Sequence, residues 1–133
     1  MSLLALFNWS EKAKPCQIRL KRYGLKKSYH LFDFFDGKYL GKIEDKAELG
    51  WIPPRGVRYF ALAEISNKPQ IIGLDFHLGA GTQGAKIQKR ANQLRLELEL
   101  AGSRAGKIWL SLPRKPKPTI VEIGFENKTN IKI

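Results

Sequence analysis

A regular alternation of apolar and polar residues with a period of two constrains this chain more than any other feature. Within residues 16–21, Cys16, Ile18 and Leu20 alternate with Gln, Arg and Lys, and the same alternation runs through residues 94–100 and 121–126. Successive side chains of a β-strand point to opposite faces of the sheet. Each stretch therefore predicts a strand with one face in a core and the other in water.

Further strands are predicted where aromatic and β-branched residues gather. These runs are residues 4–9, 29–35, 57–65, 71–78 and 107–112, with shorter candidates at 39–43 and 48–52. The Asp36-Gly37 pair predicts a hairpin, and Pro53-Pro54 marks another turn. Other turns are expected at residues 67–69, 79–81, 101–102 and 127–128. Residues 113–118, which read PRKPKP, predict a connection between strands.

The number and spacing of these runs predict an all-β protein, an antiparallel immunoglobulin-like β-sandwich that forms a single domain over residues 1–133. No long amphipathic helix is indicated. The nearest candidate is residues 84–93, which could form one turn of helix. With 43% hydrophobic and 27% charged residues, the chain has the composition of a globular domain.

Cysteine usage and hydropathy bear on location. Cys16 is the one cysteine, so an internal disulfide is excluded, as is common for a reducing compartment. The apolar run at residues 3–7 is far too short to span a bilayer. We therefore expect a cytoplasmic protein without a membrane partner.

The net charge of +12, with a sequence pI near 10.0, would attract nucleic acid or other anions. The charge is spread over both halves of the chain, and its densest stretch is residues 12–27. We interpret most of it as solvated surface, with an anion-binding face as the alternative.

Three segments together resemble one family. They are residues 5–9 (ALFNW), 29–43 (YHLFDFFDGKYLGKI) and 56–84 (GVRYFALAEISNKPQIIGLDFHLGAGTQG). This pattern resembles the C-terminal β-sandwich domain of melibiase-type glycoside hydrolases, the α-galactosidases and their relatives. The resemblance covers roughly residues 4–113, and Phe35 stands where those relatives often have tryptophan.

The resemblance implies an accessory domain without the enzyme. In that family a (β/α)8 barrel precedes the β-domain and carries two catalytic aspartates, and nothing before Leu4 corresponds to it. Residues 1–3 could then be a leader in front of the domain, or the chain could equally be a stand-alone descendant of this domain. The expected partner is a catalytic barrel, on the same chain or a separate one.

Few residues suggest catalysis or metal binding. Asp33 and Asp36 could be read as a pair of catalytic carboxylates, but Asp36 is better explained by its turn. Asp75 and His77 share a strand face at a spacing of two, where we expect a structural hydrogen bond. The glycine-rich residues 79–84 lack the features of a phosphate-binding loop, and no zinc-ligand spacing exists. We expect no catalytic residue, no metal and no cofactor.

Aromatic residues supply the candidate binding sites. Trp9, Trp51 and Trp109 would stack on sugar rings if exposed, with the tyrosines Tyr29, Tyr39 and Tyr59 as additional members. Interleaved with Lys and Arg, the same aromatics would suit single-stranded nucleic acid.

Phe7, Phe34 and Phe35 are candidate interface residues. On one strand Phe34 and Phe35 would point to opposite faces, so both cannot enter the same core. One of them must contact another element, a partner chain or water, and we expect two copies of this chain to pair through that surface.

Three functions follow from these features. The first is a non-catalytic accessory β-sandwich that packs against and stabilises a catalytic barrel. The second is a carbohydrate-binding module. The third is a basic β-protein that binds nucleic acid non-specifically.

Overall fold

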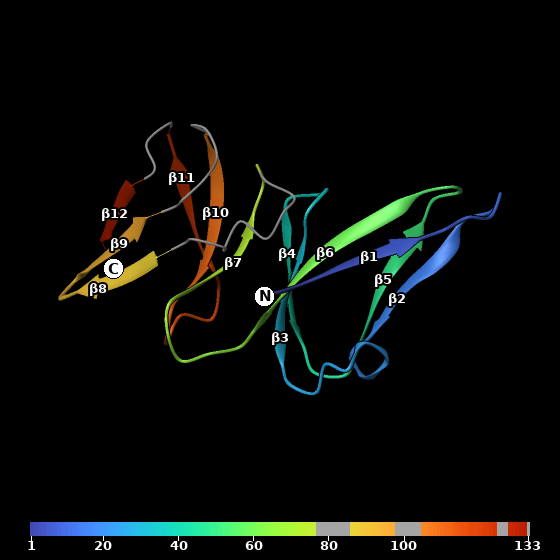
Figure 1. Cartoon of the computed structure of the whole chain (residues 1–133), viewed down its shortest axis with the longest axis horizontal. Coiled ribbons are helices and arrows are strands. Elements are labelled where there is room, and N and C mark those ends of the chain that lie inside the picture. The colour runs from blue at the N-terminus through green and yellow to red at the C-terminus, as the bar shows by residue number, and fades with distance from the viewer. Residues whose placement is uncertain (77–85, 98–104, 125–127, 133) are drawn as a thin grey trace. The chain divides into compact units, whose positions relative to one another are not determined.

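The computed structural model describes residues 1–76, 86–97, 105–124 and 128–132. These residues form an all-β protein of twelve strands with antiparallel pairing and one short 3-10 helix. The chain divides into two compact units, Met1–Ile65 and Ser66–Ile133 (Figure 1). The all-β class is thereby confirmed, whereas the immunoglobulin-like arrangement and the single domain stay predictions. No helix in the described ranges has the length and apolarity that a membrane crossing needs.

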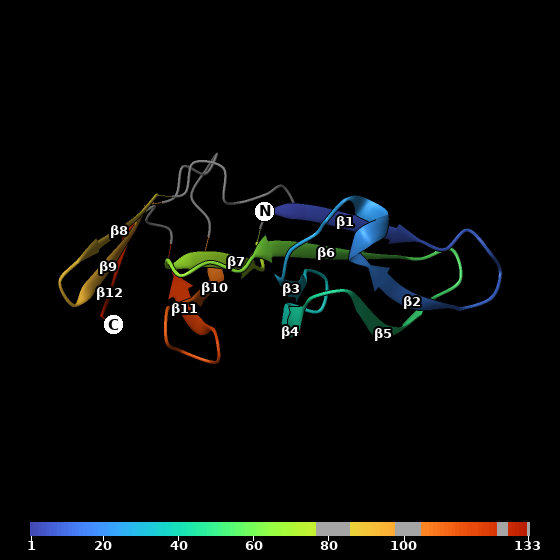
Figure 2. The same cartoon turned by 90° about the horizontal axis from the view of Figure 1, so that it is seen from below.

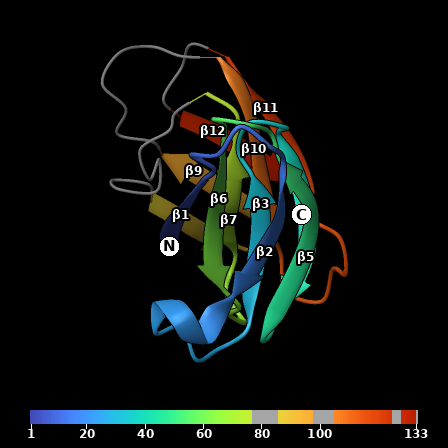
Figure 3. The same ribbon diagram turned by 90° about the vertical axis from the view of Figure 1, so that its right-hand side faces the viewer.

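Unit 1 contains two sheets. The four-stranded sheet has the order β1-β6-β3-β4, and β2 pairs with β5 in a separate two-stranded sheet. Figure 3 looks onto this unit with β2 and β5 in front of β3 and β6. The 3-10 helix η1, Leu20–Tyr23, follows β2 and is the coil seen beside β1 in Figure 2. The strands are β1 (Ser2–Phe7), β2 (Lys14–Arg19), β3 (Tyr29–Asp33), β4 (Lys38–Ile43), β5 (Lys46–Ile52) and β6 (Val57–Glu64).

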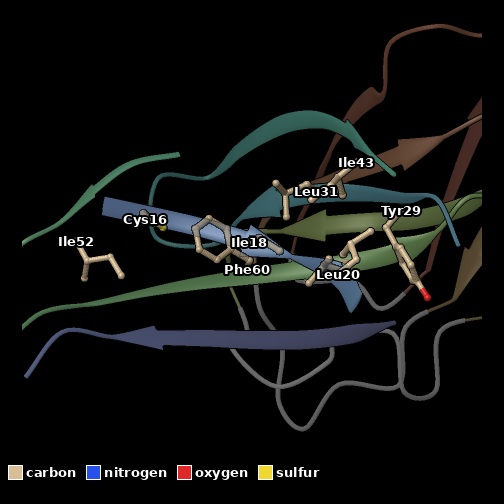
Figure 4. Close-up of a cluster of buried hydrophobic side chains, with 9 residues drawn as sticks. Cys16, Ile18, Leu20, Tyr29, Leu31, Ile43, Ile52 and Phe60 are labelled. Carbon is tan, nitrogen blue, oxygen red and sulfur yellow. The ribbon is translucent and has the colours of Figure 1, made fainter. Parts of the chain in front are cut away.

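The core of unit 1 lies between these two sheets (Figure 4). Cys16 and Ile18 enter it from β2, and Phe60 and Leu62 enter it from β6. Leu20 continues the alternation of β2 into the core although it belongs to η1. The predicted inward face of residues 16–20 is confirmed. Unit 1 is therefore a small two-layer sandwich.

The turn between β3 and β4 shows where the alternation stops. Residues 34–37 form the turn, and Gly37 takes a φ of 58°, which favours glycine. The hairpin predicted from Asp36-Gly37 is confirmed. The strand predicted for residues 29–35 ends instead at Asp33, whose carboxylate accepts a hydrogen bond from the Asp36 N–H at 3.2 Å. Phe34 and Phe35 are turn residues, so the strand alternation applies to neither of them.

Unit 2 contains two three-stranded sheets, ordered β11-β10-β7 and β12-β9-β8. Leu94 and Leu96 are buried on β9 as predicted, whereas Leu98 and Phe125 lie outside the described residues. The helical turn suggested for residues 84–93 is wrong. A tight turn at residues 91–92, with Ala91 at a φ of 47°, pairs β8 with β9 instead. The strands are β7 (Gln70–Leu74), β8 (Lys86–Arg90), β9 (Gln93–Glu97), β10 (Gly106–Ser111), β11 (Thr119–Ile123) and β12 (Lys128–Lys132).

Candidate functional site

The register of β1 on β6 sorts the residues of the four-stranded sheet onto two faces. Leu4 and Leu6 pack against the core of unit 1, so their neighbours Ala5 and Phe7 point away from it. Ala5 lies opposite Tyr59 of β6 and therefore shares its face. This outward face carries the candidate site.

An exposed stacked pair lies at one end of the outward face. The rings of Phe7 and Trp9 are 5.4 Å apart between centroids and only 5° from parallel. Phe7 is 56% exposed and Trp9 is 82% exposed. Stacked aromatic rings of this size left in water mark a surface whose purpose is not folding alone.

A second aromatic group lies on the same face. Phe34 contacts Tyr59 edge to face, with centroids 6.0 Å apart and an interplanar angle of 88°. Phe35 lies 6.3 Å from Tyr59 and 6.0 Å from Phe34, and it is 57% exposed. The Phe34 N–H donates to the Tyr59 carbonyl at 2.9 Å, which holds the turn beside β6. We call these two groups, Phe7, Trp9, Phe34, Phe35 and Tyr59, the aromatic face.

The aromatic face gathers the predicted interface residues on one side of one sheet. Between its two groups, the outward positions of β1 and β6 are Ala5 and Val57, both half-buried. The outward positions of these two strands carry no charged side chain; they are Leu3, Ala5, Phe7, Val57, Tyr59, Ala61 and Ala63. The face is thus apolar over both strands.

The opposite side of unit 1, the outer face of the β2–β5 sheet, is polar. Gln17 donates to Glu48 at 3.3 Å, and Arg19 donates to Gln17 at 2.8 Å. Trp51 is 63% exposed here because a register shift near Gly50, which has a φ of 75°, changes the phase of β5. Ala47 and Leu49 point inward before this bulge, and Ile52 points inward after it.

The three tryptophans therefore do not share one stacking surface. Trp9 and Trp51 lie on opposite sides of unit 1, and Trp109 belongs to β10 of unit 2. Trp109 is only 7% exposed, so its ring offers no face to a sugar, and this part of the prediction is corrected. Of the tyrosines, Tyr29 is buried in the core, and Tyr39 is half-buried against His30.

Asp33 and Arg58 form a buried ion pair on the inner side of the four-stranded sheet. Asp33 is 1% exposed, and Arg58 also donates to the Leu49 carbonyl and lies 5.1 Å from the centroid of Phe60. Burial opposes the charge of Arg58, but the hydrogen bond and the charge of Asp33 outweigh it and raise the pKa of Arg58. Asp33 thus holds the sandwich together, and Asp36 lies exposed on the turn.

The other candidate catalytic groups are also engaged in the fold. The Asp75 carboxylate accepts the Lys107 N–H at 2.8 Å and so extends the pairing of β7 with β10. His77 and the glycine-rich residues 79–84 lie outside the described residues. Burial raises the pKa of the Cys16 thiol, which makes it a poor nucleophile. In the described part of the chain, no group of His, Cys, Asp and Glu could hold a metal ion.

Asn8 is a positioning residue that sequence reasoning missed. Its side-chain amide donates to the carbonyls of Lys12, Ile52 and Pro53 at 2.8, 3.2 and 3.0 Å. Its side-chain oxygen accepts the Ser10 hydroxyl at 2.7 Å. Asn8 is buried, and it lies between Phe7 and Trp9 in the sequence. Its hydrogen bonds therefore hold the backbone from which both rings project. The sequence signal that could have found Asn8 is a polar residue placed between two aromatic residues.

No protein-family model matches the chain, and neither a curated protein nor a solved structure matches it. The resemblance to the β-domain of melibiase-type enzymes therefore stays a prediction.

Proposed function

We propose that this chain is a non-catalytic accessory module that docks through its aromatic face onto a catalytic (β/α)8 barrel, in cis or in trans. The observation that carries the proposal is the exposure of Phe7, Trp9 and Phe35 on the side of unit 1 where the outward positions of β1 and β6 are all uncharged. Free monomers rarely leave such rings together in water, whereas aromatic anchors dominate protein interfaces. The resemblance to the α-galactosidase β-domain motivates the choice of partner.

The absence of catalysis is part of the same proposal. Asp33, which a glycosidase-like pair would need, is buried and neutralised by Arg58. We therefore expect the purified chain to hydrolyse no aryl α-galactoside. The expected setting is the cytoplasm, which is supported by a single thiol, Cys16, that lies free and buried.

The docking test uses the barrel of an α-galactosidase of this type produced without its own β-domain. We expect the chain to form a one-to-one complex with this barrel by light scattering and calorimetry. Trp9→Ser and Phe35→Ser should each weaken the complex at least about tenfold, because interface anchors contribute about 2 kcal/mol or more.

Trp51→Ser is the matched control, because the Trp51 ring is also more than half exposed and lies on the opposite side of unit 1. This variant should bind like the original chain. The absence of a complex, or an equal loss with Trp51→Ser, would remove the docking proposal. Without a barrel, the same face should pair two copies at high concentration.

A carbohydrate-binding function is the second candidate, favoured by the Trp9 indole. This ring is backed by Phe7 and leaves its other face open, which suits stacking on a sugar ring. Titration with galactose and melibiose distinguishes the two functions. Sugar binding that Trp9→Ser abolishes and Phe35→Ser spares would favour the carbohydrate-binding module.

A further inference from the structure

Unit 2 contains a cavity of about 710 Å³. Its walls come from three segments: residues 67–69 before β7, the strand β8, and the β10–β11 loop. Ile87 and Lys89 of β8 both line it, as expected for residues two apart on one strand. A cavity of this size falls within the range of about 300–1,000 Å³ that small-molecule sites occupy.

The charge lining this cavity has one sign. Lys68, Lys89, Arg114 and Lys115 line it together, and no carboxylate does. Across the described ranges, none of these four side chains forms an ion pair. All four residues are exposed, and cations that line one cavity repel one another, so the fold gains nothing by collecting them.

Two other cations of unit 2, Arg95 and Lys107, are paired with acids. Arg95 lies 3.0 Å from Glu97, and Lys107 lies 4.0 Å from Glu122. An anion bound in the cavity would relieve the repulsion that the four lining cations share.

The backbone at Arg114 supports a binding role for this cavity. The Lys115 N–H donates to the Leu112 carbonyl at 3.1 Å and closes a turn with Pro113 and Arg114 at its centre. Arg114 has a φ of 68°, at the turn position where a positive φ normally selects glycine. An arginine held in this conformation costs stability, as Arg55 and Ala91 do at their own turns, so this strain adds to the charge of the cavity and does not mark a site alone.

The composition of the lining points to the class of ligand. One phosphate group carries at most about two negative charges and the two linked phosphates of a nucleoside diphosphate about three, so four cations suit a diphosphate better than a single phosphate. Apart from the polar Asn67, the other lining residues are apolar and suit a ring; they are Pro69, Ile87, Leu112 and Pro113. We infer that unit 2 binds a small diphosphate compound with a ring, of the nucleoside diphosphate kind. This inference is independent of the docking proposal.

The test is calorimetric titration of the full chain with pyrophosphate, with ADP and with a short oligothymidylate. ADP should bind more tightly than pyrophosphate, because only ADP has a ring for the apolar walls. Lys89→Gln and Lys115→Gln should each weaken ADP binding about tenfold, the usual size of one charge-assisted contact.

Lys117→Gln is the matched control. It removes the same charge from the same exposed loop, two residues from Lys115, but Lys117 does not line the cavity. It should change ADP binding less than about twofold. Equal losses for Lys117→Gln and Lys115→Gln would mean diffuse attraction to a chain of charge +12 and would overturn the site.

Arg114→Gly separates binding from folding. Glycine accepts the positive φ, so the melting temperature should stay the same or rise while ADP binding weakens about tenfold. Unchanged ADP binding in this variant, or no ADP binding at millimolar concentration, would contradict the inference. Tighter binding of oligothymidylate than of ADP, with the same loss in the Lys89 variant, would assign the pocket to a nucleic-acid backbone and overturn the small-molecule ligand.

Discussion

The two outward sides of unit 1 differ although one core supports both. On the β2–β5 sheet, Gln17, Arg19 and Glu48 form a cross-strand polar network. This is the usual solvent face of an antiparallel sheet. On the four-stranded sheet, the outward residues of β1 and β6 are apolar, and Phe7 and Phe35 are more than half exposed. Folding requires only the polar kind of face, so the aromatic face marks where contact with another molecule is expected.

The largest expected effect tests whether both sides depend on one core. Phe60 is fully buried between the two sheets, so Phe60→Ala should lower the free energy of unfolding by about 3–5 kcal/mol. Urea denaturation followed by circular dichroism measures this loss. Phe60→Leu, which keeps most of the volume, should cost less than about 1.5 kcal/mol. An equal loss of unfolding free energy in Phe60→Ala and Phe60→Leu would mean that the volume of the Phe60 ring does not hold the two sheets of unit 1 together.

The next effect concerns the ion pair inside the sandwich. Arg58→Met leaves the Asp33 carboxylate buried without its partner and should cost about 3 kcal/mol. Lys27→Met is the control, because Lys27 pairs with Glu64 in an exposed position and should change the free energy of unfolding far less than Arg58→Met does. Chemical denaturation of both variants in the same buffer measures the two losses in the free energy of unfolding. A smaller loss for Arg58→Met than for Lys27→Met would contradict a structural role for the buried pair.

A smaller effect tests the bulge that exposes Trp51 on the polar side. Gly50 has a φ of 75°, so Gly50→Ala should cost about 1–2 kcal/mol of strain and shift the Trp51 emission. Gly124→Ala is the comparison, because a Cβ there meets open space. Thermal melts and tryptophan fluorescence report both. An unstrained Gly50→Ala protein would show that the bulge is not what turns Trp51 outward.

The smallest effect is a pH dependence on the apolar side. His30 pairs with Ala63 and so shares the outward face of β6, and its Nδ1 lies 3.0 Å from the Tyr39 hydroxyl. Its Nε2 is buried without a hydrogen-bond partner. Burial first, and the charge of Lys42 second, lower the pKa of His30 in the folded chain below its ordinary 6.5.

Protonation is then easier in the unfolded chain, so stability should fall as the pH drops below about 6.5. It should keep falling until the folded pKa is reached. Denaturation between pH 8 and pH 5 measures this slope, and His30→Gln should reduce it. A slope that survives in His30→Gln would assign the pH dependence to other groups.

The period-two pattern predicted the strands and the inward residues well where one face is buried, as at Cys16 and Ile18 of β2 and at Leu94 and Leu96 of β9. It failed where the chain changes direction. Asp33 starts a turn that removes Phe34 from the strand, and the bulge at Gly50 reverses the side to which Trp51 points. Both events depend on local hydrogen bonding that composition does not encode.

The candidate site was less predictable than the fold. Trp109 looked like Trp9 in the sequence, but it lies on β10 between Ile108 and Leu110, which are also buried. Whether one or both faces of a strand are covered depends on distant parts of the chain. Pattern alone therefore could not tell the buried indole from the exposed one, although it selected Phe7, Phe34 and Phe35.

The buried thiol of Cys16 can report how often unit 1 opens. Cys16 is 1% exposed in the core, and a buried thiol with a raised pKa reacts slowly with disulfide or maleimide reagents. Labelling of this one atom therefore requires that β2 separate from the sheet beneath it. Because the sequence contains no second cysteine, the labelling rate measures the opening frequency of unit 1 and does not measure that of unit 2. Mass spectrometry of the labelling reaction over time can thus follow the local opening of unit 1 in the unmodified sequence.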